Sequence, residues 1–77
     1  MREINVDGVN YSVSDPTKDP SRYTIWLGDK IVGYVGVSGG RYQLFDVENR
    51  GTRFYAPKTA DGVEELVRSL HRENSSR

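Results

Sequence analysis

The sequence predicts an α+β fold, in which an antiparallel β-meander with an N-terminal β-hairpin carries one C-terminal helix packed on the sheet. Three observations predict it: short alternating apolar runs, glycine-containing turns between them, and helical spacing of apolar residues only near the C-terminal end. The 77 residues are 35% hydrophobic and 29% charged. We therefore expect a single small α+β domain over residues 1–72, followed by a polar, frayed tail over 73–77.

The first element is a β-hairpin around Asp7-Gly8. An Asp-Gly pair suits a two-residue type I′ turn, because both positions need a positive φ. This turn places Val6 opposite Val9 and Ile4 opposite Tyr11, which gathers the apolar residues on one face. Turn and pattern agree, so the hairpin is well defined by the sequence.

The middle of the chain reads as a four-stranded meander. A proline-containing loop over 15–21 precedes it, and three turns divide it: Gly28-Asp29, Ser38-Gly39-Gly40 and Asn49-Arg50-Gly51. The strands between these turns are expected over 22–27, 30–37, 41–47 and 52–56.

The last element is an amphipathic helix. Pro57 ends the final strand, and Thr59 or Asp61 then caps a helix that runs to about Arg72. Its apolar stripe has the spacing i, i+3, i+4, i+7 and consists of Val63, Leu66, Val67 and Leu70. Acidic residues come early and basic residues late, as the helix dipole favours.

Two-residue turns fix an expected register, with Tyr23 opposite Tyr34, Ile25 opposite Val32, and Tyr34 opposite Phe45. One face of the meander then holds Tyr23, Ile25, Leu27, Val32, Tyr34, Phe45 and Val47, and the other holds Trp26, Ile31, Val35, Val37, Tyr42 and Leu44. One helix cannot cover two apolar faces. We expect the hairpin on the second face, a sheet curled into a partial barrel, or a dimer. Gly33 and Gly36, inside a strand, would suit a bend or bulge of such a curled sheet. A three-residue turn over 38–40 would instead exchange the faces of the third meander strand.

Several kinds of chemistry find no support in the sequence. The chain has no cysteine, which excludes disulfides and thiolate sites. The single histidine, His71, reads as a helix-end residue, and the glycines between 33 and 40 precede a strand rather than the helix that a phosphate loop needs. Asp15 and Asp19 are too few for a calcium loop. We expect no enzyme activity, cofactor or metal.

The charge and hydropathy of the chain limit the kinds of partner that we expect. Eleven basic and eleven acidic residues give a formal net charge of zero, unlike a strongly basic nucleic-acid coat protein. No apolar run approaches the roughly 20 residues of a membrane span, and the start lacks an apolar signal region. We expect a cytoplasmic protein without membrane contact.

One segment nevertheless has features of a nucleic-acid surface. Residues 31–60 carry a net charge of +2, and the expected row of Tyr23, Tyr34 and Phe45 has the form of a base-stacking platform. The candidate residues of this alternative are Tyr34, Arg41, Phe45, Arg50, Arg53 and Lys58. The same aromatic row would also serve as ordinary sheet packing.

The element order over roughly residues 31–70 supports that alternative. Three strands followed by a helix, with Gly40-Arg41-Tyr42 opening a strand and Lys58-Thr59 before the helix, is similar to small sheet-plus-helix DNA readers such as the integrase arm-binding and plant AP2 domains. Those domains are usually more basic than this chain. The resemblance implies a DNA-binding sheet, on element order alone.

The leading expectation from the sequence is a small non-catalytic binding or regulatory protein that acts through protein–protein contact. Its partner would be an unidentified protein or a second copy of the chain. The absence of a catalytic motif, the zero net charge and the surplus of apolar sheet surface favour this interpretation over nucleic-acid binding.

Overall fold

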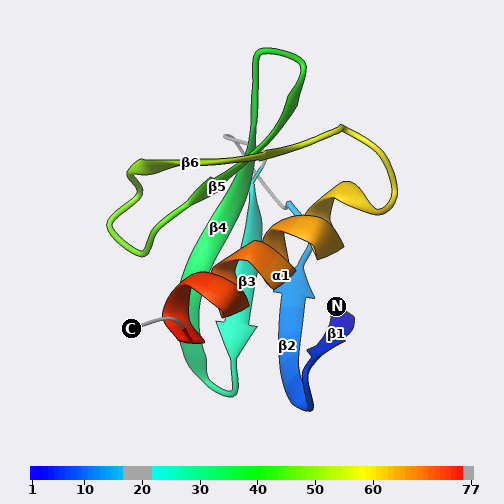
Figure 1. Ribbon diagram of the computed structural model, residues 1–77, viewed down its shortest axis with the longest axis vertical. Helices are drawn as coiled ribbons and strands as arrows, with labels where there is room; N and C mark the ends of the chain where they lie inside the picture. The colour runs from blue at the N-terminus through cyan, green and yellow to red at the C-terminus, as the bar shows by residue number, and fades with distance from the viewer. Residues whose placement is uncertain (17–21, 76–77) are drawn as a thin grey trace.

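A computed structural model describes residues 1–16 and 22–75. It contains one sheet and one helix, arranged as the sequence predicts: β1 (Arg2–Val6), β2 (Val9–Ser14), β3 (Tyr23–Leu27), β4 (Lys30–Ser38), β5 (Arg41–Phe45), β6 (Gly51–Ala56) and α1 (Gly62–Ser75). The six strands follow one another in the sheet in chain order, each antiparallel to the next. Helix α1 lies across one face of the twisted sheet (Figure 1). Strands β1 and β6 do not pair, so the sheet is not closed into a barrel.

The predicted two-residue turns are present, but the tight turn predicted at Asn49-Arg50-Gly51 is wrong: β5 ends at Phe45, which pairs with Gly51, and residues 46–50 form a longer loop. Asp7 and Gly8 have φ values of 52° and 84°, and they place Val6 opposite Val9 and Ile4 opposite Tyr11. The other two hairpins also close with two-residue turns, which pair Leu27 with Lys30 and Ser38 with Arg41. The predicted pairing of Tyr34 with Phe45 is confirmed. Turn chemistry therefore determined most of the register.

The register between β3 and β4 differs from the prediction because of a β-bulge. Trp26 pairs with Ile31, but Ile25 pairs with Gly33, so Val32 is an extra residue on β4. Beyond the bulge, Tyr23 lies opposite Val35 rather than Tyr34. Tyr23 therefore does not belong to the expected row of three aromatic residues, whereas Tyr34 and Phe45 do.

The bulge brings Ile25, Val35, Tyr42 and Leu44 to the same side of the sheet, although the sequence prediction separated Ile25 from the other three. We call this side the helix face. It forms one core with the apolar stripe of α1, and its buried members are Ile4, Val6, Tyr11, Val13, Ile25, Val35, Tyr42, Leu44, Ala56, Val63, Leu66, Val67 and Leu70.

The N-terminal hairpin does not cover the opposite face, as had been one expectation. It extends the sheet beside β3, and its apolar residues face α1. Tyr11 on β2 fixes this arrangement, because its hydroxyl lies 2.9 Å from Nδ1 of His71 on the helix. Nε2 of His71 lies 3.4 Å from a carboxylate oxygen of Asp7. Burial raises the pKa of the Tyr11 hydroxyl. His71 is thus a packing residue between helix and hairpin.

The uncovered side of the sheet, which we call the open face, is polar over the hairpin. Asn5 and Asn10 hydrogen bond at 2.7 Å, and the Ser12 hydroxyl donates to Glu3 at 3.0 Å. Apolar and aromatic side chains occur on this face only from β3 onward. The expected composition of the two faces is therefore wrong in β3: the bulge brings Tyr23 and Ile25 to the helix face, whereas Trp26 joins Ile31, Tyr34 and Phe45 on the open face.

Helix α1 begins at Gly62, directly after Asp61, whose carbonyl accepts a hydrogen bond from the Glu65 amide at 3.0 Å. A Cβ atom on Gly62 would lie 2.1 Å from the Pro57 carbonyl oxygen and 2.8 Å from the Tyr42 ring. Glycine is therefore required for close packing at the start of the helix. The helix continues to Ser75, beyond the expected end near Arg72.

Candidate functional site

The open face carries four aromatic side chains, one on each strand from β3 to β6: Trp26, Tyr34, Phe45 and Tyr55. Tyr34 and Phe45 are direct cross-strand neighbours. Trp26 is held by a hydrogen bond from its indole N–H to the Ser14 hydroxyl at 3.0 Å. The first three are half-buried and Tyr55 is 40% exposed. The sheet therefore presents an aromatic surface that α1 does not cover.

Phe45 has one ring face covered by an arginine. The guanidinium carbon of Arg22 lies 4.0 Å from the ring centroid. Arg22 is oriented further by a hydrogen bond to the side-chain oxygen of Asn49. A Cβ atom on Gly36 would lie 3.0 Å from Cε1 of Phe45 and 3.5 Å from Nε of Arg22, so this glycine borders the edge of the ring beside the arginine. The result is a guanidinium group packed over a phenyl ring.

A second arginine has the same relation to a ring. The guanidinium carbon of Arg41 on β5 lies 4.1 Å from the ring centroid of Tyr55 on β6. Tyr55 pairs with Gln43, and both belong to the open face by strand alternation. Among the described residues, neither Arg22 nor Arg41 forms an ion pair with a carboxylate. Both charges are therefore available to an anionic partner.

Arg50 has a different environment, in the loop between β5 and β6. Its Nε lies 3.1 Å from Asp46 and its Nη2 lies 2.5 Å from Glu48. Asp46 also accepts hydrogen bonds from the backbone amides of Glu48 and Arg50, at 3.0 and 2.8 Å. The bonds from Arg50, the backbone bond first, hold the pKa of the Asp46 carboxyl below its usual range. The positive charge of Arg50 thus organises its own loop.

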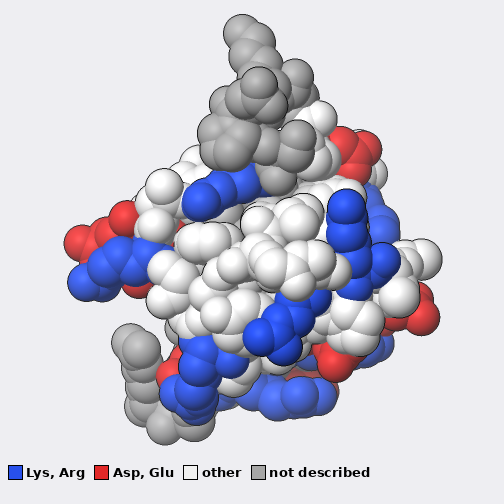
Figure 2. Space-filling model, turned by 90° about the horizontal axis from the view of Figure 1, so that it is seen from above, with Lys and Arg blue, Asp and Glu red and all other residues white. Residues whose placement is uncertain are grey.

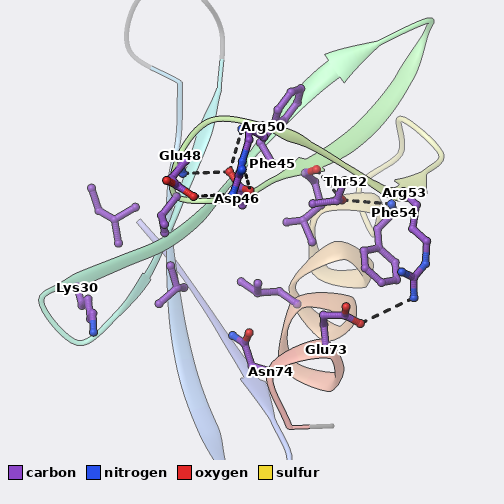
Figure 3. Close-up of a pocket in the computed structure, with 15 residues that line it drawn as sticks. Lys30, Phe45, Asp46, Glu48, Arg50, Thr52, Arg53, Phe54, Glu73 and Asn74 are labelled. Carbon is purple, nitrogen blue, oxygen red and sulfur yellow. Dashed lines mark hydrogen bonds and ion pairs between the residues drawn. The ribbon is translucent and has the colours of Figure 1, made fainter. Parts of the chain in front are cut away.

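Arg53 lies at the rim of a cavity of about 590 Å³ between the end of α1, the β5–β6 loop and the start of β4 (Figure 3). Its Nη2 atom lies 3.9 Å from Glu73, and its guanidinium lies over the Phe54 ring. The cavity has an apolar floor that includes Val32, Leu44 and Leu70. Charged side chains of both signs surround it, so it offers no preference for an anion.

The six sequence candidates therefore separate into groups. Tyr34, Phe45 and Arg41 share the open face, whereas Arg50 and Arg53 are engaged by carboxylates and Lys58 lies in the exposed connection between β6 and α1. Seen from the end where the β4–β5 hairpin projects, lysine and arginine groups surround an uncharged centre rather than forming one continuous patch (Figure 2).

Sequence reasoning missed Arg22 and Tyr55, and it assigned Trp26 to the face opposite Tyr34. Arg22 precedes β3, and no periodic pattern places such a residue. The bulge decided the face of Trp26, and the neighbouring Gly33 was its only signal.

Within the described residues, no group of three histidine or acidic side chains is placed to hold a metal ion, and no helix is long and apolar enough to cross a membrane. Comparison of the chain with protein-family models, with curated proteins and with solved structures gives no match in any of the three.

Proposed function

We propose that this protein is a small non-catalytic module that binds nucleic acid through the open face of its sheet. The observation that carries the proposal is the pair of arginines, Arg22 and Arg41, each laid over an aromatic ring and without a carboxylate partner among the described residues. An arginine held in this way presents its planar set of N–H donors to phosphate or base edges.

The composition of the open face also favours a polar, anionic partner. Beside the arginines and aromatic rings it carries serine, threonine, asparagine and glutamine side chains, which are the usual partners of phosphates and bases. The prediction of protein contact depended on a second, largely apolar face. Since the uncovered face instead combines its aromatic rings with arginines and polar side chains, the order of the two candidate functions is reversed here.

Protein–protein contact remains the second candidate, supported by exposed apolar side chains. Leu27, Val37 and Val47 are 41%, 49% and 56% exposed. They lie at strand ends and in a loop rather than in one patch. The partner would be an unidentified protein or a second copy of the chain, and a concentration series in analytical ultracentrifugation tests the latter. Cytoplasmic residence stays a prediction.

The test is an equilibrium binding measurement by fluorescence anisotropy, with labelled single-stranded and double-stranded oligonucleotides of mixed sequence, at low and at physiological salt. We expect salt-sensitive binding to at least one of the two, because phosphate contacts release counterions. The double variant Arg22→Ala/Arg41→Ala should abolish most of this binding.

The matched control is Arg68→Ala/Arg72→Ala, which removes the same charge from the helix. It should bind as the unchanged protein does. Equal losses in the two double variants would mean that only net charge matters, and no binding to either oligonucleotide would reject the proposed function in favour of a protein partner.

A further inference from the structure

The two arginine–ring pairs differ from a base-stacking platform in one respect. On a stacking platform the ring faces are free for bases. Here Arg22 lies over one face of Phe45, and Gly36 borders the Cδ1–Cε1 edge of the same ring, close to the Arg22 side chain. Tyr55 likewise has Arg41 over its ring. The rings are therefore supports for the guanidinium groups.

We infer that Arg22 and Arg41 bind backbone phosphates of the nucleic acid, and that Phe45 and Tyr55 are positioning residues that hold these guanidinium groups flat and open to solvent. This inference rests on the proposed function and adds which chemical group of the ligand is recognised. The anionic phosphate is the complement of two arginines that lack carboxylate partners within the described residues.

The preorganisation of each guanidinium has a physical basis. A free arginine side chain loses much rotamer freedom when it binds, and this loss opposes association. Contact with a ring at about 4 Å, as measured for both pairs, restricts the side chain before the ligand arrives. The hydrogen bond from Arg22 to Asn49 restricts it further. The ring therefore acts on binding through the arginine.

A double-mutant cycle separates this arrangement from direct stacking. Its variants are Arg41→Ala, Tyr55→Leu and the combination of the two, measured by anisotropy against the oligonucleotide that the unchanged protein binds best. Tyr55 is 40% exposed on an edge strand, so its replacement should leave the fold intact. Phe45→Leu with Arg22→Ala forms the second cycle, and dispersion of the amide spectrum checks the fold.

We expect Arg41→Ala to weaken binding roughly tenfold, as for one charge-assisted contact. It should also reduce the slope of log K against log salt concentration by about one. Tyr55→Leu should weaken binding in the unchanged background and have no further effect once Arg41 is absent, because the ring has then lost the group that it positions.

Additive effects of the two substitutions would overturn the inference, since a ring that stacks on bases contributes without the arginine. An unchanged salt slope in Arg41→Ala would also overturn it, because that arginine would then contact no phosphate. Both results require that the unchanged protein binds. Absence of all binding rejects the proposed function itself, so the two failures are distinguishable.

Discussion

Single side chains determine the local geometry of the candidate site, and Gly36 is the clearest case. A side chain at this position would force the Phe45 ring, over which Arg22 lies, to shift by a few tenths of an ångström. A methyl group at this position would lie 3.5 Å from Nε of Arg22 as well as 3.0 Å from the ring. Gly36, which the sequence suggests only as a bend position, therefore makes room for the Phe45 ring and for the Arg22 side chain.

Asp46 provides a prediction about pH at the residue scale. Its pKa is lowered in the folded protein, first by the hydrogen bond from the Arg50 backbone amide. A lowered folded-state pKa means that the carboxylate stabilises the loop above the usual aspartate range and loses this effect as the pH falls through the lowered value. In a carboxyl ¹³C titration, we expect Asp46 to titrate below the usual aspartate range.

The Arg50 amide should shift in the same step, because it donates to the Asp46 carboxylate. In Asp46→Asn this step should be absent from the Arg50 amide. If Asp46 titrated at the usual aspartate value, the hydrogen-bonded loop would not exist as described.

At the scale of elements, the start of α1 allows a test in which two physical effects oppose each other. Helix propensity alone predicts that Gly62→Ala stabilises the protein by about 1 kcal/mol. The structure predicts the opposite sign, because the added Cβ would lie 2.1 Å from the Pro57 carbonyl oxygen, a backbone atom that cannot move freely. We expect a net loss of about 1–3 kcal/mol in the free energy of unfolding.

Urea denaturation measures this loss, and Ser69→Ala is the control. Ser69 lies in the middle of the same helix and donates a hydrogen bond only to the Glu65 carbonyl. Its replacement should change the stability by less than about 0.5 kcal/mol. A stabilised Gly62→Ala variant would show that the helix does not approach Pro57 and Tyr42 this closely.

The elements themselves were largely predictable. Asp7-Gly8 and the two other two-residue turns gave the number of strands, their order and most of their pairing, because each turn type requires particular residues. The apolar stripe of α1 gave the helix. Gly33 and Gly36 suggested a bend or bulge in this strand, but the extra residue Val32 and its effect on the register were not predictable, because they depend on packing between strands.

The extra residue Val32 also changes which side chains lie at the candidate site on the open face. With Val32 inserted, Ile25 joins the core and Tyr23 turns to the helix face, where its ring lies edge-on to Tyr42 at 5.8 Å. The hydrogen bond with Tyr42 and burial raise the pKa of Tyr23. Tyr34 and Phe45, whose pairing the sequence predicted, remain on the open face, but the arginine over Phe45 follows only from the folded chain.

At the scale of the whole molecule, the asymmetry between the two sides of the sheet is the main feature. The helix face holds the buried apolar core, and the open face combines aromatic rings, arginines and small polar side chains. A net charge of zero for the chain does not conflict with this, because Asp46 and Glu48 form ion pairs with Arg50, and neither Arg22 nor Arg41 has an ion pair among the described residues. Local charge, rather than net charge, determines how a surface attracts an anion.

The proposed contact between nucleic acid and the two open-face arginines, Arg22 and Arg41, can be observed at the arginine side chains themselves. The most direct measurement is a titration of the arginine Nε–Hε NMR signals with the best-bound oligonucleotide at low salt, assigned by single substitutions. We expect the oligonucleotide to shift the signals of Arg22 and Arg41, and we expect added salt to return them to their free positions. The signals of Arg68 and Arg72 on the helix should stay in place. Shifts confined to the helix arginines, or no shift at all, would contradict the proposed contact.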